Sequence, residues 1–298
     1  MSRQRPATIS VTNAKGGTGK TTVAINVAGA LAERGRDVLF VDLDPQGNAT
    51  EGLGLVEAYE RDPPTIFDAL TDHRRRDAVE ELIVEHPEMD VVPSSIDLLQ
   101  AERELTIANL VARAKSGPGA GVDPWRLAEL GINVTPETVD GPHAFDLLER
   151  ALSPVEGDYD YVIVDSPPFY GNLTDAGLYA SRNVLVPALT EATSERAIEL
   201  LFDQIVALER QADIAISEVG AVANRVETTN EDEEMIAWLN AVFDDVPVWE
   251  VRKRVALQRA LAAGESILSY DPSIDVADVF RAAAADLDEQ FDFMEVPA

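Results

Sequence analysis

The sequence of 298 residues predicts an α/β fold in which a mostly parallel, twisted β-sheet is covered by helices on both faces. Three observations support this prediction. Short apolar runs that are typical of buried strands alternate with helical segments along the chain. A glycine-rich segment follows the first of these runs, and aspartates follow two later ones. Strands that are separated by helices form right-handed βαβ units, which align the strands in parallel.

The predicted elements follow one another in a regular order. The first strand covers residues 7–12 and leads through the glycine-rich segment into a helix that begins near Lys20. A second strand is expected at residues 37–41, where the apolar run is typical of a strand buried on both faces. Further strands are expected at residues 90–93, 159–165, 183–187, 218–224 and 246–249, and helices at residues 195–211 and 275–293.

Residues 112–143 interrupt this alternation. A linker-like cluster rich in glycine occupies residues 115–121, and residues 122–142 contain three prolines and little periodicity. We expect this stretch to be a surface insertion in a single domain that spans residues 1–298.

The composition is strongly acidic and lacks cysteine. The chain carries 54 Asp and Glu against 24 Lys and Arg, which gives a net charge of −30. Without cysteine there is no disulfide, no thiolate metal site and no iron–sulfur cluster. No apolar run approaches the ~20 residues of a membrane span. The N-terminus lacks the apolar core of a signal peptide, so we expect a cytoplasmic location.

The acidity has two interpretations. One is a generally solvated surface. The other, which we favour, is adaptation to a halophile's cytoplasm at molar salt, where the screening length is only ~3 Å and self-repulsion is mild. Under both interpretations the overall charge repels DNA, so any DNA contact needs a local basic patch.

The glycine-rich segment at residues 13–22 reads NAKGGTGKTT. It fits the phosphate-loop (P-loop) pattern G-x-x-x-x-G-K-[ST] except at the first glycine, where Ala14 stands, and it carries an additional lysine, Lys15. Glycines let successive backbone N–H groups form a concave anion site, and the positive end of the following helix faces the same anion. The alternative, a glycine-rich turn that binds nothing, is disfavoured by the strand before it and the helix after it.

The loop residues have distinct expected roles. Lys20 should reach the β- and γ-phosphates of a nucleotide, and the Thr21 hydroxyl should bind Mg²⁺. The expected nucleotide-binding residues of the loop are Lys15, Gly16, Gly17, Thr18, Gly19, Lys20, Thr21 and Thr22.

Carboxylates follow two predicted strands, at the sheet edge where ligands of open α/β folds bind. Asp42 and Asp44 leave the second strand two residues apart, so both can face the phosphate loop. One can help to hold hydrated Mg²⁺, and the other can orient the attacking water. Asp165 ends the strand at residues 159–165 in the Walker B pattern, whose carboxylate holds Mg²⁺. Each motif alone could be a turn residue, but in this order behind a phosphate loop they indicate a nucleotide site.

Asn224 ends a further strand. Its side-chain amide could pair with the adenine edge of a nucleotide, or it could simply begin a turn.

Together these motifs resemble those of the deviant Walker A ATPases, specifically the ParA/Soj partition proteins. The resemblance implies an ATP-dependent, Mg²⁺-requiring homodimer that binds DNA non-specifically on the nucleoid, works with a ParB-like stimulating protein and is reset by hydrolysis. In that family the lysine matching Lys15 crosses the dimer interface to the partner's phosphates, and the aspartate matching Asp44 is needed for hydrolysis. The matching runs are KGGTGKTT at 15–22, DLDPQGN at 42–48, VPSSIDL at 92–98, DYDYVIVDSPP at 158–168 and SYDP at 269–272.

Other members of this group fit less well. The nitrogenase iron protein and the iron–sulfur carrier ATPases need cysteines. MinD-type ATPases carry a basic amphipathic helix at the C-terminus, whereas the segment here is acidic, so we expect no stable membrane anchoring.

One departure from the family concerns a segment that usually contains proline and arginine. It reads VRKRVALQR at residues 251–259 here, without the proline. The candidates for a DNA-contacting patch are Arg252, Lys253, Arg254 and Arg259; the alternative is that they form salt bridges with neighbouring acids.

The sequence therefore favours a partition ATPase. Two alternatives stay open: an ATPase that positions a cargo other than DNA, and a nucleotide-gated regulator that acts through protein contacts.

Overall fold

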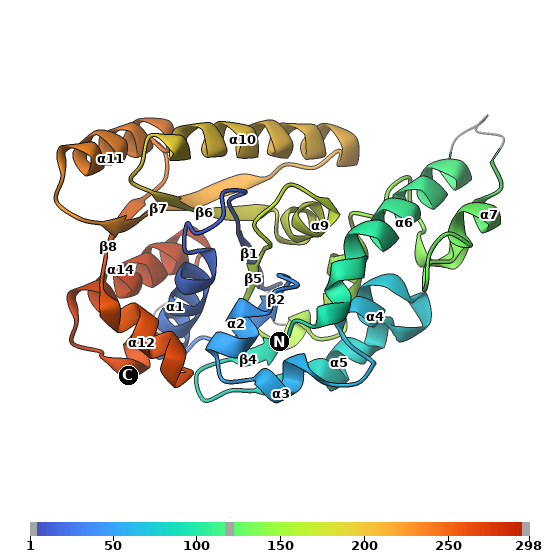
Figure 1. Cartoon of the computed structure of the whole chain (residues 1–298), viewed down its shortest axis with the longest axis horizontal. Coiled ribbons are helices and arrows are strands. Elements are labelled where there is room, and N and C mark those ends of the chain that lie inside the picture. Colours follow the sequence, from blue (N-terminus) through green and yellow to red (C-terminus); the bar gives the residue numbers. More distant parts are fainter. Residues whose placement is uncertain (1–4, 117–121, 294–298) are drawn as a thin grey trace.

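The structure, a computed structural model, describes residues 5–116 and 122–293. Its strands are β1 (Ala7–Val11), β2 (Val38–Asp42), β3 (Val84–Glu85), β4 (Asp90–Val92), β5 (Tyr161–Asp165), β6 (Asn183–Leu189), β7 (Ser217–Val226) and β8 (Val248–Arg252). They form one sheet in the order β3-β4-β2-β5-β1-β6-β7-β8 (Figure 1). All neighbouring strands pair in parallel except β3, which runs antiparallel to β4 at the edge. The predicted fold class is confirmed.

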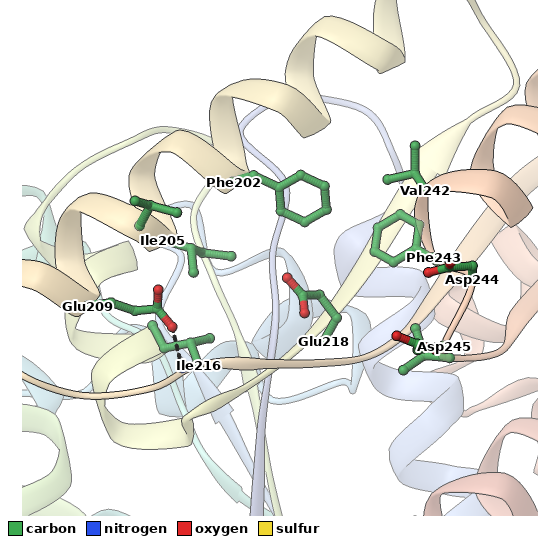
Figure 2. A pocket seen from close by; sticks show the side chains of 11 residues that line it. Phe202, Ile205, Glu209, Ile216, Glu218, Val242, Phe243, Asp244 and Asp245 are labelled. Atoms are coloured by element: carbon green, nitrogen blue, oxygen red, sulfur yellow. Dashed lines mark hydrogen bonds between the residues drawn. The ribbon is translucent and has the colours of Figure 1, made fainter.

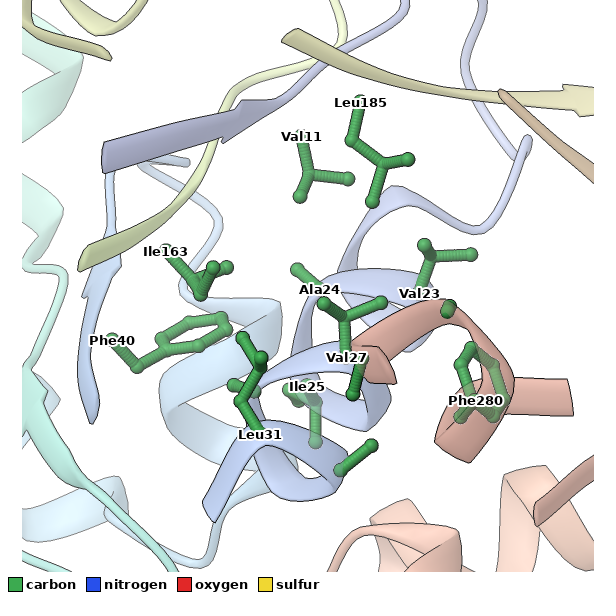
Figure 3. Close-up of a cluster of buried hydrophobic side chains, with 14 of the residues drawn as sticks. Val11, Val23, Ala24, Ile25, Val27, Leu31, Phe40, Ile163, Leu185 and Phe280 are labelled. Atoms are coloured by element: carbon green, nitrogen blue, oxygen red, sulfur yellow. The ribbon is translucent and has the colours of Figure 1, made fainter. Parts of the chain in front are cut away.

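One face of the sheet is covered by α1 (Lys20–Glu33), α12 (Val255–Ala263), α13 (Ile267–Tyr270) and α14 (Asp275–Gln290). Figure 3 shows Ile25, Val27 and Leu31 of α1 between the sheet residues Phe40 and Ile163 and the α14 residue Phe280. α1 is buried between the sheet and α14. Its burial fixes the C-terminal end of the glycine-rich loop that precedes α1.

The other face carries α4 (Ile66–Thr71), α5 (Val79–Leu82), α6 (Ala101–Ser116), α8 (Leu147–Leu152), α9 (Asn172–Ser181), α10 (Thr193–Ala212) and α11 (Asn230–Val242). The central strands alternate between the two faces. Phe40 and Ile163 point to the side of α1, whereas Val41 and Val164 point to the opposite side. Burial on both faces explains why these strands read as continuous apolar runs. The short helices α2 (Asn48–Gly52), α3 (Val56–Tyr59) and α7 (Pro124–Ala128) lie in connections.

The segment that we predicted to be a surface insertion is partly built into the core. Its first residues belong to α6, so the predicted boundary at residue 112 falls inside a helix. Val134 and Val139 are buried in the same cluster as α4 and α8. Lys115 Nζ donates to the carbonyl oxygens of Pro136 and Val139, both at 2.6 Å, which joins the segment to α6. Residues 117–121 lie outside the described ranges. The single domain with an insertion stays a prediction.

The C-terminal helix also differs from the expectation in its extent. α14 ends at Gln290 rather than at residue 293, and Phe280 and Leu287 on its apolar side are buried against the core. Among residues 5–116 and 122–293, no helix is long and apolar enough to cross a membrane.

Candidate active site

The phosphate loop connects β1 to α1 at the carboxyl edge of the sheet. Gly19, directly before α1, has a φ of 86°, a left-handed value that favours glycine. A Cβ at Gly19 would also lie 2.1 Å from Asn224 Nδ2, so the loop and β7 approach each other too closely for any side chain there. A Cβ at Gly16 would meet nothing within 4 Å, which leaves the front of the loop open to a ligand.

Two buried asparagines join the loop to neighbouring strands. Asn13 Nδ2 donates to the carbonyl oxygen of Pro187 in β6 at 2.8 Å, and Asn13 Oδ1 accepts from the backbone N–H of Lys15 at 3.0 Å. Asn224 Nδ2 donates to the carbonyl oxygen of Thr18 at 2.8 Å. These hydrogen bonds join the loop to β6 and β7. Sequence reasoning missed the role of Asn13, although its position directly behind the first strand was a signal.

A cavity of about 290 Å³ opens beside Asn224, at the carboxyl ends of β6 and β7. Thr190, Arg225 and Asp232 contribute to its lining. Its place next to the loop suits a nucleobase. Asn224 Oδ1 also accepts from the backbone N–H of Arg225 at 2.9 Å, so these two hydrogen bonds leave one N–H and one oxygen lone pair of the amide for a ligand. Adenine pairing by Asn224 stays a prediction.

The structure brings the predicted metal-binding residues together at the same edge. Asp42 and Asp165 are register partners on the neighbouring strands β2 and β5, and both are fully buried. Thr21 Oγ1 donates to Asp165 Oδ2 at 2.7 Å, which links the first turn of α1 to the Walker B position. Within the described residues, Asp165 Oδ1 is buried without a hydrogen-bond partner.

Burial governs the protonation of this cluster. It raises the pKa of Asp42 to about 7, although Thr50 and the Asp44 backbone donate hydrogen bonds that oppose the shift. Burial, reinforced by the charge of Asp42, raises the pKa of Asp165 well above its usual range, and burial also raises the pKa of Asp44. The pKa of Lys20 is lowered by burial, against the charges of Asp165 and Asp44. Three buried carboxylates beside one lysine lack positive charge, which a divalent cation would supply.

The residues fit a Mg²⁺ ion. The unsatisfied Asp165 Oδ1 and the Thr21 hydroxyl are hard oxygen ligands directly behind the phosphate loop. Mg²⁺ in nucleotide sites commonly uses one or two protein oxygens and takes its other ligands from phosphates and water. The described part of the chain contains no group of three or more His, Cys, Asp or Glu that could hold a metal ion, so the remaining ligands would come from those sources.

The predicted role of Asp42 as a second metal ligand is untested. Asp42 Oδ2 accepts from the backbone N–H and the hydroxyl of Thr50 at 2.9 and 2.7 Å, and Oδ1 accepts from the Asp44 N–H at 3.1 Å. Its two oxygens are therefore already engaged in holding the turn after β2.

Asp44 lies at the start of that turn. Its side chain is buried, and its Oδ1 accepts from the backbone N–H of Gln46 at 2.9 Å. Ser94 Oγ, beyond β4, donates to the Asp44 carbonyl oxygen at 2.6 Å. Because both its backbone and its side chain are fixed, Asp44 can hold a water molecule in one orientation.

Lys15 contacts residues of its own chain in this structure. Its Nζ donates to Glu191 Oε2 at 2.9 Å and to Thr193 Oγ1 at 2.6 Å, and it lies 3.4 Å from Ser194 Oγ. Glu191 lies in the connection between β6 and α10, and Thr193 and Ser194 are the first residues of α10. Reaching a second subunit would require Lys15 to leave them. Sequence reasoning missed Glu191 and Thr193, because nothing in their spacing relates them to residue 15.

The candidate DNA patch lies at the end of β8, in the two-residue connection that follows, and on α12. Lys253 pairs with Glu227 at 2.6 Å, Arg254 pairs with Asp275 at 2.6 Å, and Arg252 lies 4.0 Å from Asp275. Arg259 is exposed on α12. The pairing agrees with the alternative interpretation, in which these cations serve salt bridges. DNA contact stays a prediction, and phosphates would have to compete with Glu227 and Asp275.

Comparisons with known proteins agree with this geometry. The sequence profile of an AAA domain family (AAA_31) matches residues 6–114 and 129–217 and leaves 115–128 unmatched. The sporulation initiation inhibitor protein Soj of Bacillus subtilis is 31% identical over 284 residues, which cover 94% of this chain and 97% of Soj. The cell division protein PomZ of Myxococcus xanthus is 28% identical over 275 residues, 91% of this chain and 74% of PomZ. A solved structure of a Cyanothece McdA–ATP complex superposes with a TM-score of 0.74 at 20% identity, covering 99% of this chain and 100% of McdA.

Proposed function

Because this chain belongs to the AAA domain family of P-loop ATPases, together with Soj, we propose that it drives the partition of chromosomes or plasmids. The chain is an ATPase that uses ATP and Mg²⁺. In the proposed cycle, ATP joins two copies of the chain, the dimer binds DNA on the nucleoid without sequence preference, and hydrolysis, stimulated by a ParB-like protein, separates the dimer. The observation that carries the ATPase site is the unsatisfied Asp165 Oδ1 beside Thr21, behind the phosphate loop.

The position of each residue in the site determines its proposed role. The N–H groups of the loop and the first turn of α1 bind the phosphates, and Lys20 neutralises part of their charge. Thr21 and Asp165 would hold Mg²⁺, which when bound neutralises charge that develops on the phosphates. Asp44 orients the attacking water, and its raised pKa favours acceptance of a proton.

Lys15 gives the first test of the dimer. We expect Lys15→Gln to bind ATP normally but to dimerise at least ~10-fold more weakly, because the partner's phosphates lose a charge-assisted contact. Size-exclusion chromatography with light scattering, with ATP and Mg²⁺, measures dimerisation, and a fluorescent ATP analogue measures binding. Glu191→Gln is the matched control: it releases Lys15 from its salt bridge within the chain and should leave dimerisation intact or strengthen it. Unchanged dimerisation of Lys15→Gln would show that Lys15 does not act across the interface.

The basic patch gives the test of DNA binding. The monomer should bind DNA weakly, and the ATP dimer should bind measurably because it presents two copies of the patch. We expect Lys253→Glu with Arg254→Glu to abolish binding while ATP-dependent dimerisation persists. Gel shifts with non-specific DNA across a salt series measure this, since affinity falls with a log–log slope of ~0.9 per phosphate contacted.

A control variant must separate the effect of the patch on DNA binding from the effect of net charge. Arg196→Glu with Arg281→Glu makes the same charge change at two arginines whose salt bridges lie outside the patch, and it should retain more DNA binding than the patch variant. Equal binding by the patch variant and the parent would show that the patch is elsewhere. A parent that binds no DNA in any nucleotide state would favour the regulator that acts through protein contacts, which the pairing of Lys253 and Arg254 with acids already supports. The similarity to PomZ keeps the positioning of another cargo open as well.

The net charge of −30 supports a further proposal, that the protein works at high salt. Repulsion between exposed carboxylates acts over ~10 Å at 0.1 M salt but only ~3 Å at 1 M. We therefore expect the melting temperature to rise steadily between 0.1 and 1 M KCl, as measured by circular dichroism. Sucrose of equal osmolality is the control for effects other than screening. A melting temperature that is constant or falls with KCl would contradict adaptation to salt.

A further inference from the structure

A second cavity, of about 370 Å³, lies away from the nucleotide edge, against the first residues of β7 (Figure 2). Its walls come from α10, from β7 and its approach, and from the chain just after α11. The floor is apolar: Ile205, Ile216 and Phe243 are buried, and the ring of Phe202 lies 5.7 Å from that of Phe243. Val206 contributes a side chain that is exposed to solvent. The cavity therefore offers contact area to an apolar side chain from outside.

The polar part of the lining is entirely acidic. Glu209, Glu218, Asp244 and Asp245 line the cavity, and no Lys, Arg or His does. Glu209 accepts a hydrogen bond from the Ile216 N–H at 2.9 Å. Within residues 5–116 and 122–293, none of these four carboxylates forms a salt bridge. Glu227 and Asp275, by contrast, each form a salt bridge with a cation that follows β8. We call these four residues the acidic rim of the cavity; among the described residues, no salt bridge neutralises their negative charge.

An apolar floor with acidic residues around it favours one kind of occupant. An apolar side chain would remove the floor from water, and cationic groups beside it would neutralise the rim. Nucleic acids and anionic membranes carry the wrong sign of charge. We propose that the cavity is a docking site for a partner protein's peptide segment in which a large apolar residue is flanked by Lys or Arg.

Two elements that line the cavity, α10 and β7, also contact the phosphate loop. α10 begins at Thr193, whose hydroxyl binds Lys15, and β7 carries Asn224, whose amide binds the Thr18 carbonyl. A helix of 20 residues is ~30 Å long, so α10 links the cavity to the contact with Lys15. An occupant that shifts α10 would therefore change the contacts of Lys15. This coupling rests on the proposed function, whereas the docking site does not.

Docking is tested first on the full chain without nucleotide. The probes are three fluorescein-labelled pentapeptides, Lys-Arg-Xaa-Arg-Lys with Xaa as Leu, Phe or Trp, and a fourth with Gly, measured by fluorescence anisotropy. We expect at least one apolar peptide to bind and the Gly peptide to bind at least 10-fold more weakly. Val206→Arg places a cation at the cavity itself and should weaken binding at least 10-fold. Ala207→Arg, at the next exposed position and outside the lining, should leave binding unchanged.

The charge of the rim is tested separately. Glu218→Gln with Asp244→Asn should weaken peptide binding at least 10-fold. Glu233→Gln with Glu234→Gln removes the same charge from the exposed side of α11 and should have little effect. The docking site is overturned if no apolar peptide binds below about 1 mM, if the Gly peptide binds equally well, or if Val206→Arg binds like the parent. It is also overturned if the parent self-associates and Val206→Arg abolishes that association, because the occupant is then a second copy.

Coupling has its own readout. A saturating peptide should change the ATP hydrolysis rate of the parent at least threefold and leave the rate of Val206→Arg unchanged. Peptide binding without any change in rate overturns the coupling but leaves the docking site standing. A parent that hydrolyses no ATP overturns the proposed function and leaves the anisotropy results unaffected.

Discussion

Lys20→Ala is expected to weaken ATP binding at least ~100-fold, because a buried charge that loses its partner costs about 3–5 kcal/mol. Lys20 is only 7% exposed and opens α1, where its ammonium group acts together with the helix N-terminus on the same anion. The charges of Asp165 and Asp44 raise the pKa of Lys20 and so favour its charged form, against the larger effect of burial. Isothermal titration calorimetry with ATP and Mg²⁺ measures the loss directly.

Two controls make this result specific. Removing Lys20 leaves Asp42, Asp44 and Asp165 without their buried counter-charge, so circular dichroism and a melting curve must show that the variant is folded. Lys15→Ala removes the other lysine of the loop and should retain ATP binding, since that side chain contacts Glu191 and Thr193 instead. Tight ATP binding by folded Lys20→Ala would refute the assignment of the phosphate loop.

The fold could be predicted from local patterns because its central strands are buried on both faces. Runs such as residues 37–41 and 159–165 stand out as apolar blocks, and the structure places β2 and β5 there. β3 has only two residues, too few for any periodicity, and its pairing with β4 depends on a turn that brings the two together. Residues 122–142 lacked periodicity for a different reason: Val134 and Val139 enter the core singly, between short turns, so no repeating pattern arises.

The site was predictable where its chemistry is local in sequence. The loop at residues 13–22 and the pair Asp42 and Asp44 each lie within a few residues, and the carboxyl ends of parallel strands bring Asp165 to them. What supports these residues was not predictable. Asn13 bonds to Pro187, 174 positions away, and Lys15 bonds to Glu191, 176 positions away. Such contacts depend on which strands are neighbours, and a single sequence does not give the strand order β5-β1-β6.

Asp44→Ala is expected to slow ATP hydrolysis at least ~100-fold, the usual contribution of a positioned acid–base group, while ATP stays bound. Asp44 is only 5% exposed, lies two residues beyond the end of β2, and is within electrostatic reach of Lys20. If hydrolysis separates the dimer, its loss should give a dimer that persists with ATP and Mg²⁺. Phosphate release and size-exclusion chromatography with light scattering measure the two effects on the same sample.

The chemical role of Asp44 has to be separated from its structural one, because its Oδ1 also accepts a hydrogen bond from the Gln46 N–H. Asp44→Asn keeps an oxygen for that hydrogen bond but removes the charge and the proton-accepting oxygen. If orientation and charge drive hydrolysis, Asp44→Asn should be nearly as slow as Asp44→Ala and equally dimeric. Glu51→Ala removes an exposed carboxylate from the neighbouring helix α2 and should hydrolyse ATP at the parent's rate. Normal hydrolysis by Asp44→Asn would mean that Asp44 only shapes the turn after β2, and Asp42 or Asp165 would then have to orient the water.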